Sequence, residues 1–161
     1  MSATGIGYDA HQFAADRRLV LGGVEISHER GLAGHSDADV LVHAISDALL
    51  GAAAMGDIGE HFPDTDERYR NVSSIELLRD VVGMLAERGL TVGNVDATVV
   101  IERPQLAPAR AQIRATLADA LGLTLERVSV KATRGEGMGF VGREEGVAAL
   151  AVATLNDARA H

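Results

Sequence analysis

Apolar side chains recur at helical spacing in three segments of the chain. The spacing predicts helices over residues 36–55, 74–88 and 108–121. Serines at 36 and at 73 or 74 are expected to cap the first two helices, and Pro108 suits the first position of the third. Gly56, Gly89 and Gly122 follow the three segments, and glycine is the usual residue just after a helix.

Alternating apolar and polar positions predict extended chain between these helices. Strands are expected over residues 3–13, 92–101, 128–133 and 145–155, with a hairpin or edge strand over residues 19–26. Polar, glycine-rich or proline-containing loops are expected at 31–34, 57–71, 102–107 and 134–143. We therefore predict an α/β (α+β) sandwich, in which a mixed four- to five-stranded sheet is covered by three helices on one face.

Composition narrows the class of protein. The 161 residues are 47% hydrophobic, 24% charged and 3% aromatic, which predicts one domain over residues 1–161. The net charge of −8 argues against nucleic-acid or anionic-membrane partners, and the absence of cysteine excludes disulfides and thiolate metal sites. With no apolar run of bilayer length and no secretory signal pattern, we expect a cytoplasmic protein. The core of small aliphatic side chains favours oligomerisation.

Asp9 and His11 are the first candidates for chemistry. Side chains two residues apart on a strand lie on the same face, so the carboxylate and the imidazole would face one divalent ion. The alternative is an ordinary turn carboxylate beside a surface histidine. Taken alone, an Asp-x-His pair is a weak signal.

The first predicted helix strengthens the metal hypothesis. Asp39, His43 and Asp47 lie one turn apart on a single stripe of that helix. A carboxylate on either side is the arrangement that orients an imidazole ligand through its second nitrogen. With Asp9 and His11, His43 would complete a two-histidine, one-carboxylate site with an open position, as in catalytic zinc sites. The alternative is a solvated polar stripe.

Two loops add further polar groups. Residues 57–66 supply carboxylates and a histidine, either as a solvated acidic loop or as a lid that recognises hydroxyl groups or organises a second cation. In residues 131–143, Thr133 and Arg143 stand beside glycines, and such turns bind phosphate groups, while Glu136 would hold Mg²⁺ between phosphates. The chain contains neither a P-loop nor a dinucleotide-binding fingerprint.

Four stretches together resemble one enzyme family. GIGYDAHQF, GLAGHSDADVLVHAISDALLGAAAMGDIGEHFPDTD, GNVDATVV and VKATRGEGMGFVGREEG are similar to the 2-C-methyl-D-erythritol 2,4-cyclodiphosphate synthases, over essentially the whole chain. The resemblance implies a phosphorus–oxygen lyase of the non-mevalonate isoprenoid pathway. Its reaction converts 4-diphosphocytidyl-2-C-methyl-D-erythritol 2-phosphate to 2-C-methyl-D-erythritol 2,4-cyclodiphosphate by intramolecular phosphoryl transfer, with release of CMP.

The resemblance also implies two cations. Asp9, His11 and His43 match the family's ligands for zinc or another divalent metal, and Asp9 and His11 also belong to its substrate-binding motif. Mg²⁺ or Mn²⁺ is implied with the substrate diphosphate near Glu136.

Catalytic roles are implied for His35, Thr133 and Arg134, with His35 as a stabiliser of the transition state. These three residues and Glu136 are also implied substrate contacts. The other implied substrate contacts lie in four segments: Ser36; Asp57, Ile58, Gly59, Phe62, Pro63, Asp64, Thr65 and Asp66; Ile101, Glu102, Arg103, Pro104, Gln105, Leu106 and Ala107; and Gly135, Phe140 and Arg143.

The implied assembly is a homotrimer with sites shared between subunits. Its axial cavity would hold an isoprenoid diphosphate, with Tyr8 and Arg143 as local contacts. Three residues depart from the family pattern: Arg134 replaces a second threonine, Gln105 a lysine, and Leu150 an acidic residue.

Two other functions remain as alternatives. One is a zinc phosphohydrolase in which His35 or Asp57 serves as the general base. The other is a catalytically silent trimer that binds isoprenoid diphosphates, suggested by the replacement at Arg134.

Overall fold

A mixed sheet forms the centre of the computed structural model, which describes residues 2–158. Its strands are β1 (Ser2–Ala14), β4 (Gly31–Leu32), β5 (Leu90–Val100), β6 (Val128–Thr133) and β7 (Gly146–Asp157). They lie in the order β4-β1-β7-β5-β6, where β5 and β6 are parallel and the other neighbours antiparallel. The predicted mixed sheet is confirmed, and so is the hairpin, formed by β2 (Leu19–Leu21) and β3 (Val24–Ile26).

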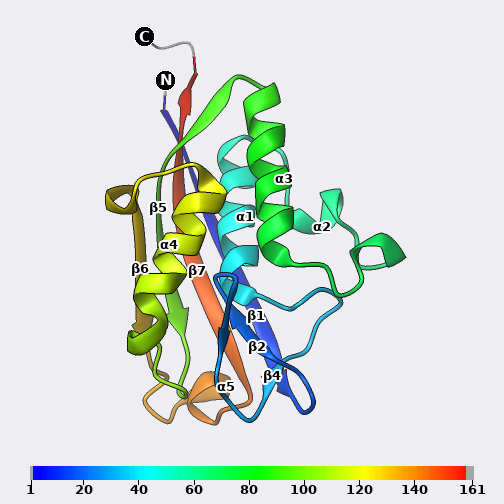
Figure 1. Cartoon of the computed structure of the whole chain (residues 1–161), viewed down its shortest axis with the longest axis vertical. Helices are drawn as coiled ribbons and strands as arrows, with labels where there is room; N and C mark the ends of the chain where they lie inside the picture. The colour runs from blue at the N-terminus through cyan, green and yellow to red at the C-terminus, as the bar shows by residue number, and fades with distance from the viewer. Residues whose placement is uncertain (1, 159–161) are drawn as a thin grey trace.

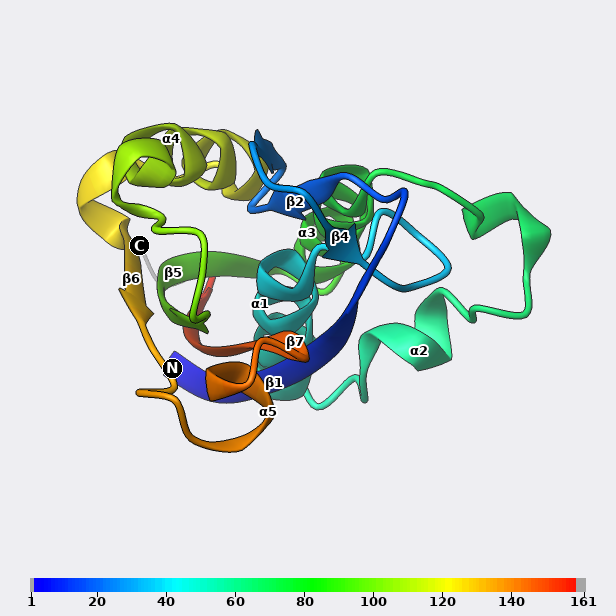
Figure 2. The ribbon, with the colours of Figure 1, turned by 90° about the horizontal axis from the view of Figure 1, so that it is seen from below.

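Helices α1 (Val40–Ala52), α3 (Ser74–Glu87) and α4 (Arg110–Leu121) lie on the same face of this sheet (Figure 1). Figure 2 shows the sheet curving around α1, the innermost helix. Helix α1 packs against β1 and β7, α3 against α1 and β5, and α4 against α3 and β6. The core therefore lies between the helices and the concave face of the sheet. The opposite face exposes the large apolar side chains of Ile6, Tyr8, Leu150 and Val152.

Two glycines of β1 let α1 approach the sheet unusually closely. A Cβ atom built at Gly5 would overlap the carbonyl oxygen of Ala48, and one at Gly7 would overlap that of Ala44. A backbone approach this close requires glycine, because the Cβ atom of any other residue would overlap the helix. The concave face of β1 consequently places Asp9, two residues beyond Gly7, directly beside the helix that contains His43.

Several predicted boundaries were wrong. Helix α1 begins at Val40 and its N-cap is Asp39 instead of Ser36, because the Asp39 carboxylate accepts the N–H of Val42. The predicted loops also contain short elements, namely β4, α2 (Ile58–His61), α5 (Gly139–Gly142) and the 3-10 helix η1 (Glu67–Tyr69). Two more 3-10 helices, η2 (Ala107–Ala109) and η3 (Leu125–Arg127), flank α4, so Pro108 lies in η2 and not in α4. Elements this short lack a periodic signal in the sequence.

We predict that Gly7→Ala destabilises the fold by about 1–3 kcal/mol, because α1 must move away from β1 to admit the methyl group. Gly83→Ala is the matched control. Gly83 is exposed in α3 with open space around its Cβ position, and this change should stabilise the fold by roughly 0.5–1 kcal/mol. Urea unfolding measures both, and equal stabilities for Gly7→Ala and the unaltered chain would contradict the packing argument.

Candidate active site

Asp9, His11 and His43 meet between β1 and α1. Asp9 Oδ2 lies 2.9 Å from His11 Nε2 and 3.1 Å from His43 Nδ1, and the two imidazole nitrogens lie 3.2 Å apart. Among residues 2–158, these three form the group of His and carboxylate side chains close enough to share one metal ion. Ligands about 2.0–2.1 Å from a tetrahedral zinc ion lie about 3.3 Å from one another, so the observed spacing fits such an ion.

The orientation of the His11 ring also suits a cation. Its Nδ1 lies 2.7 Å from the carbonyl oxygen of Ala33, which can only accept a hydrogen bond. The proton of a neutral His11 ring is therefore on Nδ1, and the lone pair of Nε2 points toward Asp9 and His43. A nitrogen lone pair beside a carboxylate oxygen is a ligand arrangement that needs a positive charge between the two.

The charges of the site favour an ionised Asp9. Burial would raise the pKa of Asp9, but His11 and His43, whose rings donate to its carboxylate when they are protonated in the absence of a metal, outweigh it and hold the pKa at about 2. Burial would likewise lower the pKa of His11, yet the hydrogen bond and the charge of Asp9 raise it. Asp9 therefore provides a full negative charge at neutral pH, as a metal ligand requires.

The carboxylates that flank His43 on α1 have other partners, which corrects the expectation that they orient this imidazole. Asp39 is fully buried and accepts the N–H groups of Gly22 at 2.9 Å and Gly23 at 2.7 Å, so it fastens the β2–β3 hairpin to α1. Burial raises the pKa of Asp39 to about 6, although these N–H groups favour the carboxylate. Asp47 accepts the N–H of Ile58 at 2.8 Å and so fixes the start of α2. The alternative of a solvated polar stripe is wrong, since Asp39 is buried and His43 and Asp47 are half-buried.

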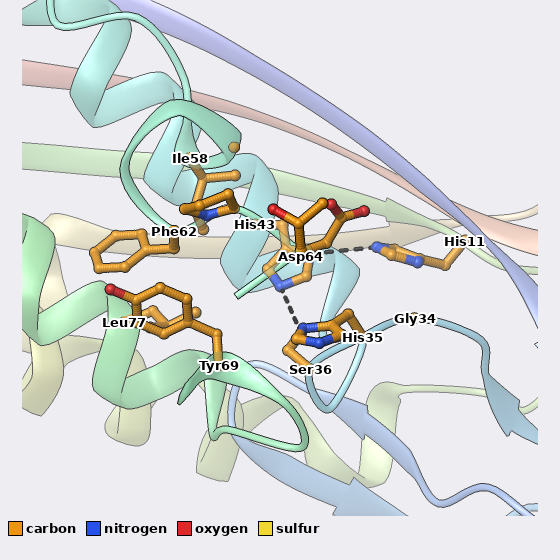
Figure 3. A pocket seen from close by; sticks show the side chains of 13 residues that line it. His11, Gly34, His35, Ser36, His43, Ile58, Phe62, Asp64, Tyr69 and Leu77 are labelled. Atoms are coloured by element: carbon orange, nitrogen blue, oxygen red, sulfur yellow. Dashed lines mark hydrogen bonds between the residues drawn. The ribbon is translucent and has the colours of Figure 1, made fainter. Parts of the chain in front are cut away.

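A cavity of about 490 Å³ opens beside His11 and His43. In Figure 3 the side chains of Phe62 and Tyr69 lie on the side of the cavity opposite His11. The predicted residues that line it are His11, His35, Ser36, His43, Ile58, Gly59, Phe62, Pro63, Asp64 and Thr65.

Three lining residues, Gly34, Tyr69 and Leu77, escaped prediction. The Tyr69 ring packs edge-on against Phe62, with the ring centres 5.4 Å apart. An aromatic residue in an otherwise polar loop was the one feature of the sequence that could have indicated its place in the cavity wall. Asp57 and Asp66 do not line this cavity. Asp57 caps α2 through the N–H of Glu60, and Asp66 caps η1 and pairs with Arg68.

A second group of predicted residues surrounds the end of β6. Two cavities, of about 590 and 170 Å³, lie there. Their lining includes Ile101, Glu102, Arg103, Pro104, Gln105, Leu106, Ala107, Thr133, Arg134 and Arg143. No residue lines both one of these cavities and the cavity beside His43. Within one chain the predicted substrate contacts therefore form two separate groups, which we call the metal half and the nucleotide half.

Glu102 organises the nucleotide half. Its Oε2 accepts the N–H of Gly135 at 2.8 Å, and its Oε1 lies 3.5 Å from Arg134 Nη2. Glu136 follows in a turn with a φ of 52°, and Phe140 lies part-exposed on α5. The turn after β6 is thus tied to the proline-containing turn after β5.

Comparison with known proteins identifies the family of this chain. The model of the YgbB family matches residues 2–156. The chain belongs to the YgbB family. This result confirms the resemblance found in the sequence motifs, because relatives of this chain are named 2-C-methyl-D-erythritol 2,4-cyclodiphosphate synthase.

The chain is 62% identical over 153 residues to the "Bifunctional enzyme IspD/IspF" of Anaeromyxobacter dehalogenans, covering 95% of this chain and 39% of that protein. It is 56% identical over 151 residues to the "2-C-methyl-D-erythritol 2,4-cyclodiphosphate synthase" of Alkaliphilus metalliredigens, covering 94% and 95% of the two chains. A solved structure, "IspF (Plasmodium falciparum) CDP complex", superposes with a TM-score of 0.85 at 29% identity, covering 97% and 96%.

The family match spans every element described above except the last residue of β7, and it includes both halves of the site. Between residues 2 and 158, no helix combines the length and hydropathy that crossing a membrane requires.

We predict that His43→Ala loses its bound divalent metal, because two of the three ligands then remain and the affinity falls steeply. Metal content per chain, measured by elemental analysis after dialysis, tests this outcome. His28→Ala is the control, since His28 packs against Phe13 away from the triad and its loss should leave the metal content unchanged. Full metal retention in His43→Ala would exclude His43 as a ligand.

Proposed function

We propose that this YgbB-family chain converts 4-diphosphocytidyl-2-C-methyl-D-erythritol 2-phosphate to 2-C-methyl-D-erythritol 2,4-cyclodiphosphate and CMP. The chain is thus a lyase of isoprenoid precursor biosynthesis. The observation that decides this is the Asp9, His11 and His43 group beside an open cavity, in a chain 56% identical to a synthase over 95% of that protein's length. An oxygen of the 2-phosphate forms a bond to the β-phosphorus. The bond from that phosphorus to the oxygen bridging the α-phosphorus breaks, and CMP leaves with this oxygen.

The metal half would hold one divalent cation, zinc in our proposal, through Asp9, His11 and His43. When bound, such an ion polarises a phosphoryl oxygen and neutralises developing charge. Its ligands leave one side open to the cavity, which is where the diphosphate would enter. A second cation, Mg²⁺ or Mn²⁺, would accompany the diphosphate near Glu136.

The chain's own residues bind and orient the substrate in this proposal. His35 and Ser36 would contact phosphate, with His35 stabilising the transition state. Residues 57–59 and 62–66 would hold the erythritol group, with Asp64 near its hydroxyls. Residues 101–107 would surround the cytosine, and residues 133–136 with Phe140 and Arg143 would bind the nucleotide phosphates. Holding the 2-phosphate in line with the β-phosphorus supplies the largest advantage, because the reaction is intramolecular.

Arg134 is proposed to act with Thr133 at the nucleotide phosphates. The carboxylate of Glu102 lies beside its guanidinium, which keeps the arginine at the rim of both nucleotide-half cavities. A cation at this position supports binding of a diphosphate, so the exchange of threonine for arginine is compatible with activity.

The proposed assembly is a homotrimer that joins the metal half of one subunit to the nucleotide half of its neighbour. Two observations support it: the separate cavities within one chain, and the exposed apolar sheet face of Ile6, Tyr8, Leu150 and Val152. An axial cavity would take an isoprenoid diphosphate, with Tyr8 and Arg143 as contacts. Residues 1–161 would act as one domain, and we place the reaction in the cytoplasm.

Product analysis tests the reaction. Purified protein is incubated with the diphosphocytidyl substrate and Mg²⁺, and phosphorus NMR follows the products. We expect equal amounts of CMP and the cyclic diphosphate, and loss of both after chelation of the metal. An open-chain phosphate would instead identify a hydrolase, and no CMP with metal bound would identify a silent binding protein.

Mixing two inactive variants tests the shared site. His43→Ala disables the metal half, and Thr133→Ala combined with Arg143→Ala disables the nucleotide half. After subunit exchange at equal concentrations, about one quarter of the sites would join two intact halves, so about one quarter of the activity should return. Mass analysis of tagged subunits confirms the exchange. A mixture that exchanges subunits and stays inactive would place both halves within one chain.

A further inference from the structure

Ser74 is buried at the start of α3 and contacts the outer nitrogen of His43. Its Oγ lies 2.9 Å from His43 Nε2 and donates a hydrogen bond to Oδ1 of Asp37. The other oxygen of Asp37, Oδ2, accepts the N–H of Ser74 at 3.0 Å. Asp37 therefore satisfies the first N–H of α3, a role that Ser73, the N-cap residue, does not fill with its own side chain.

The direction of these hydrogen bonds fixes the proton on His43. A hydroxyl group has a single proton, and the Ser74 proton is used on the Asp37 carboxylate. The remaining lone pairs of Ser74 Oγ can only accept, so His43 Nε2 must be the donor. Ser36 Oγ lies 3.3 Å from the same nitrogen and accepts the N–H of Ala38. Because the Ser74 proton is already used, Ser36 can donate its own proton to Ser74 Oγ, 3.5 Å away, and so offers His43 a second acceptor. A neutral His43 ring is consequently left with a lone pair on Nδ1, and this nitrogen faces Asp9 and His11.

We infer that Asp37 and Ser74 are positioning residues that hold His43 in the Nε2-protonated form and aim its Nδ1 lone pair at the shared metal position. The inference rests on the metal half proposed above and extends it by two residues. It also replaces the sequence-based expectation that Asp39 or Asp47 orients this ring. Partners of this type usually change metal affinity by about 10- to 100-fold when removed.

Backbone hydrogen bonds hold the two segments together independently of these side chains. The N–H of Asp37 donates to Val72 O at 3.1 Å, and the N–H of Asn71 donates to His35 O at 2.9 Å. The start of α3 therefore stays beside His43 when one side-chain hydrogen bond is removed. Substitution of Ser74 consequently tests the hydrogen bond and not the docking of the helix.

The first experiment measures the dissociation constant of zinc by competition with a chelator, using the full chain. Ser74→Ala should weaken zinc binding by about 10- to 100-fold, and Ser74→Thr, which keeps the hydroxyl, should restore most of the affinity. Ser46→Ala is the matched control, because Ser46 is a fully buried serine of α1 whose hydroxyl has no hydrogen-bond partner among residues 2–158. Zinc affinity within about twofold of the unaltered chain in Ser74→Ala, or an equal loss in Ser46→Ala, would overturn the inference.

The second experiment locates the proton without any metal. Nitrogen-15 NMR of the metal-free full chain, labelled at histidine, distinguishes the two neutral forms of the ring. The proton should reside on Nε2 of His43, and Asp37→Asn should shift it toward Nδ1, because an amide can donate to Ser74 and reverse the chain of hydrogen bonds. A proton on Nδ1 in the unaltered chain would overturn the inference. This test separates its failure from that of the proposed function, since a chain that binds no zinc can still show the Nε2 proton.

Discussion

The close approach of α1 to β1 is the constraint on which the site depends. Gly5 and Gly7 leave no side chain between strand and helix, and Ala44 and Ala48 present only backbone and methyl groups there. The next strand, β7, adds alanines along its buried face. Asp9 follows Gly7 at strand spacing, and His43 precedes Ala44, so the ligand distances follow directly from this packing. A larger residue at Gly7 would separate the two elements and with them the metal ligands.

The segment that precedes α1, residues 36–39, makes hydrogen bonds to three other parts of the fold. Ser36 and Asp37 turn toward His43 and α3, whereas Asp39 turns toward the hairpin. Between them, Ala38 adopts a φ of 57°, a left-handed conformation that costs a non-glycine residue about 1 kcal/mol. The several hydrogen bonds made by its neighbours offset this cost. The segment thus couples the metal half, α3 and the hairpin in one rigid unit.

The sequence was sufficient for the features that local spacing determines. Strand alternation placed Asp9 and His11 on one face, and the structure brings His43 close enough to this pair for the three to share one metal ion, as the metal hypothesis expected. The partner of His43 was missed because Ser74 lies 31 residues further along the chain and meets it only through the docking of α3. The role of Asp37 was missed for a related reason, since the predicted helix over residues 36–55 included it, whereas α1 begins at Val40. Contacts between distant segments leave no periodic signal.

Dividing the substrate contacts between two places has a physical consequence for the proposed assembly. Ile6, Tyr8, Leu150 and Val152 are 40–71% exposed on the face of the sheet opposite the helices. Their burial between subunits would supply association energy from residues that play no part in phosphate chemistry, except where Tyr8 reaches the axial cavity. In the proposed trimer a site would be complete only where two subunits meet, so its rigidity would depend on that apolar face as much as on the Asp9, His11 and His43 group. In the proposed assembly, subunit association and the geometry of the site are therefore set on opposite faces of the same strands. Strand β1 presents Gly7, Asp9 and His11 to α1, and would present Ile6 and Tyr8 to the neighbouring subunit.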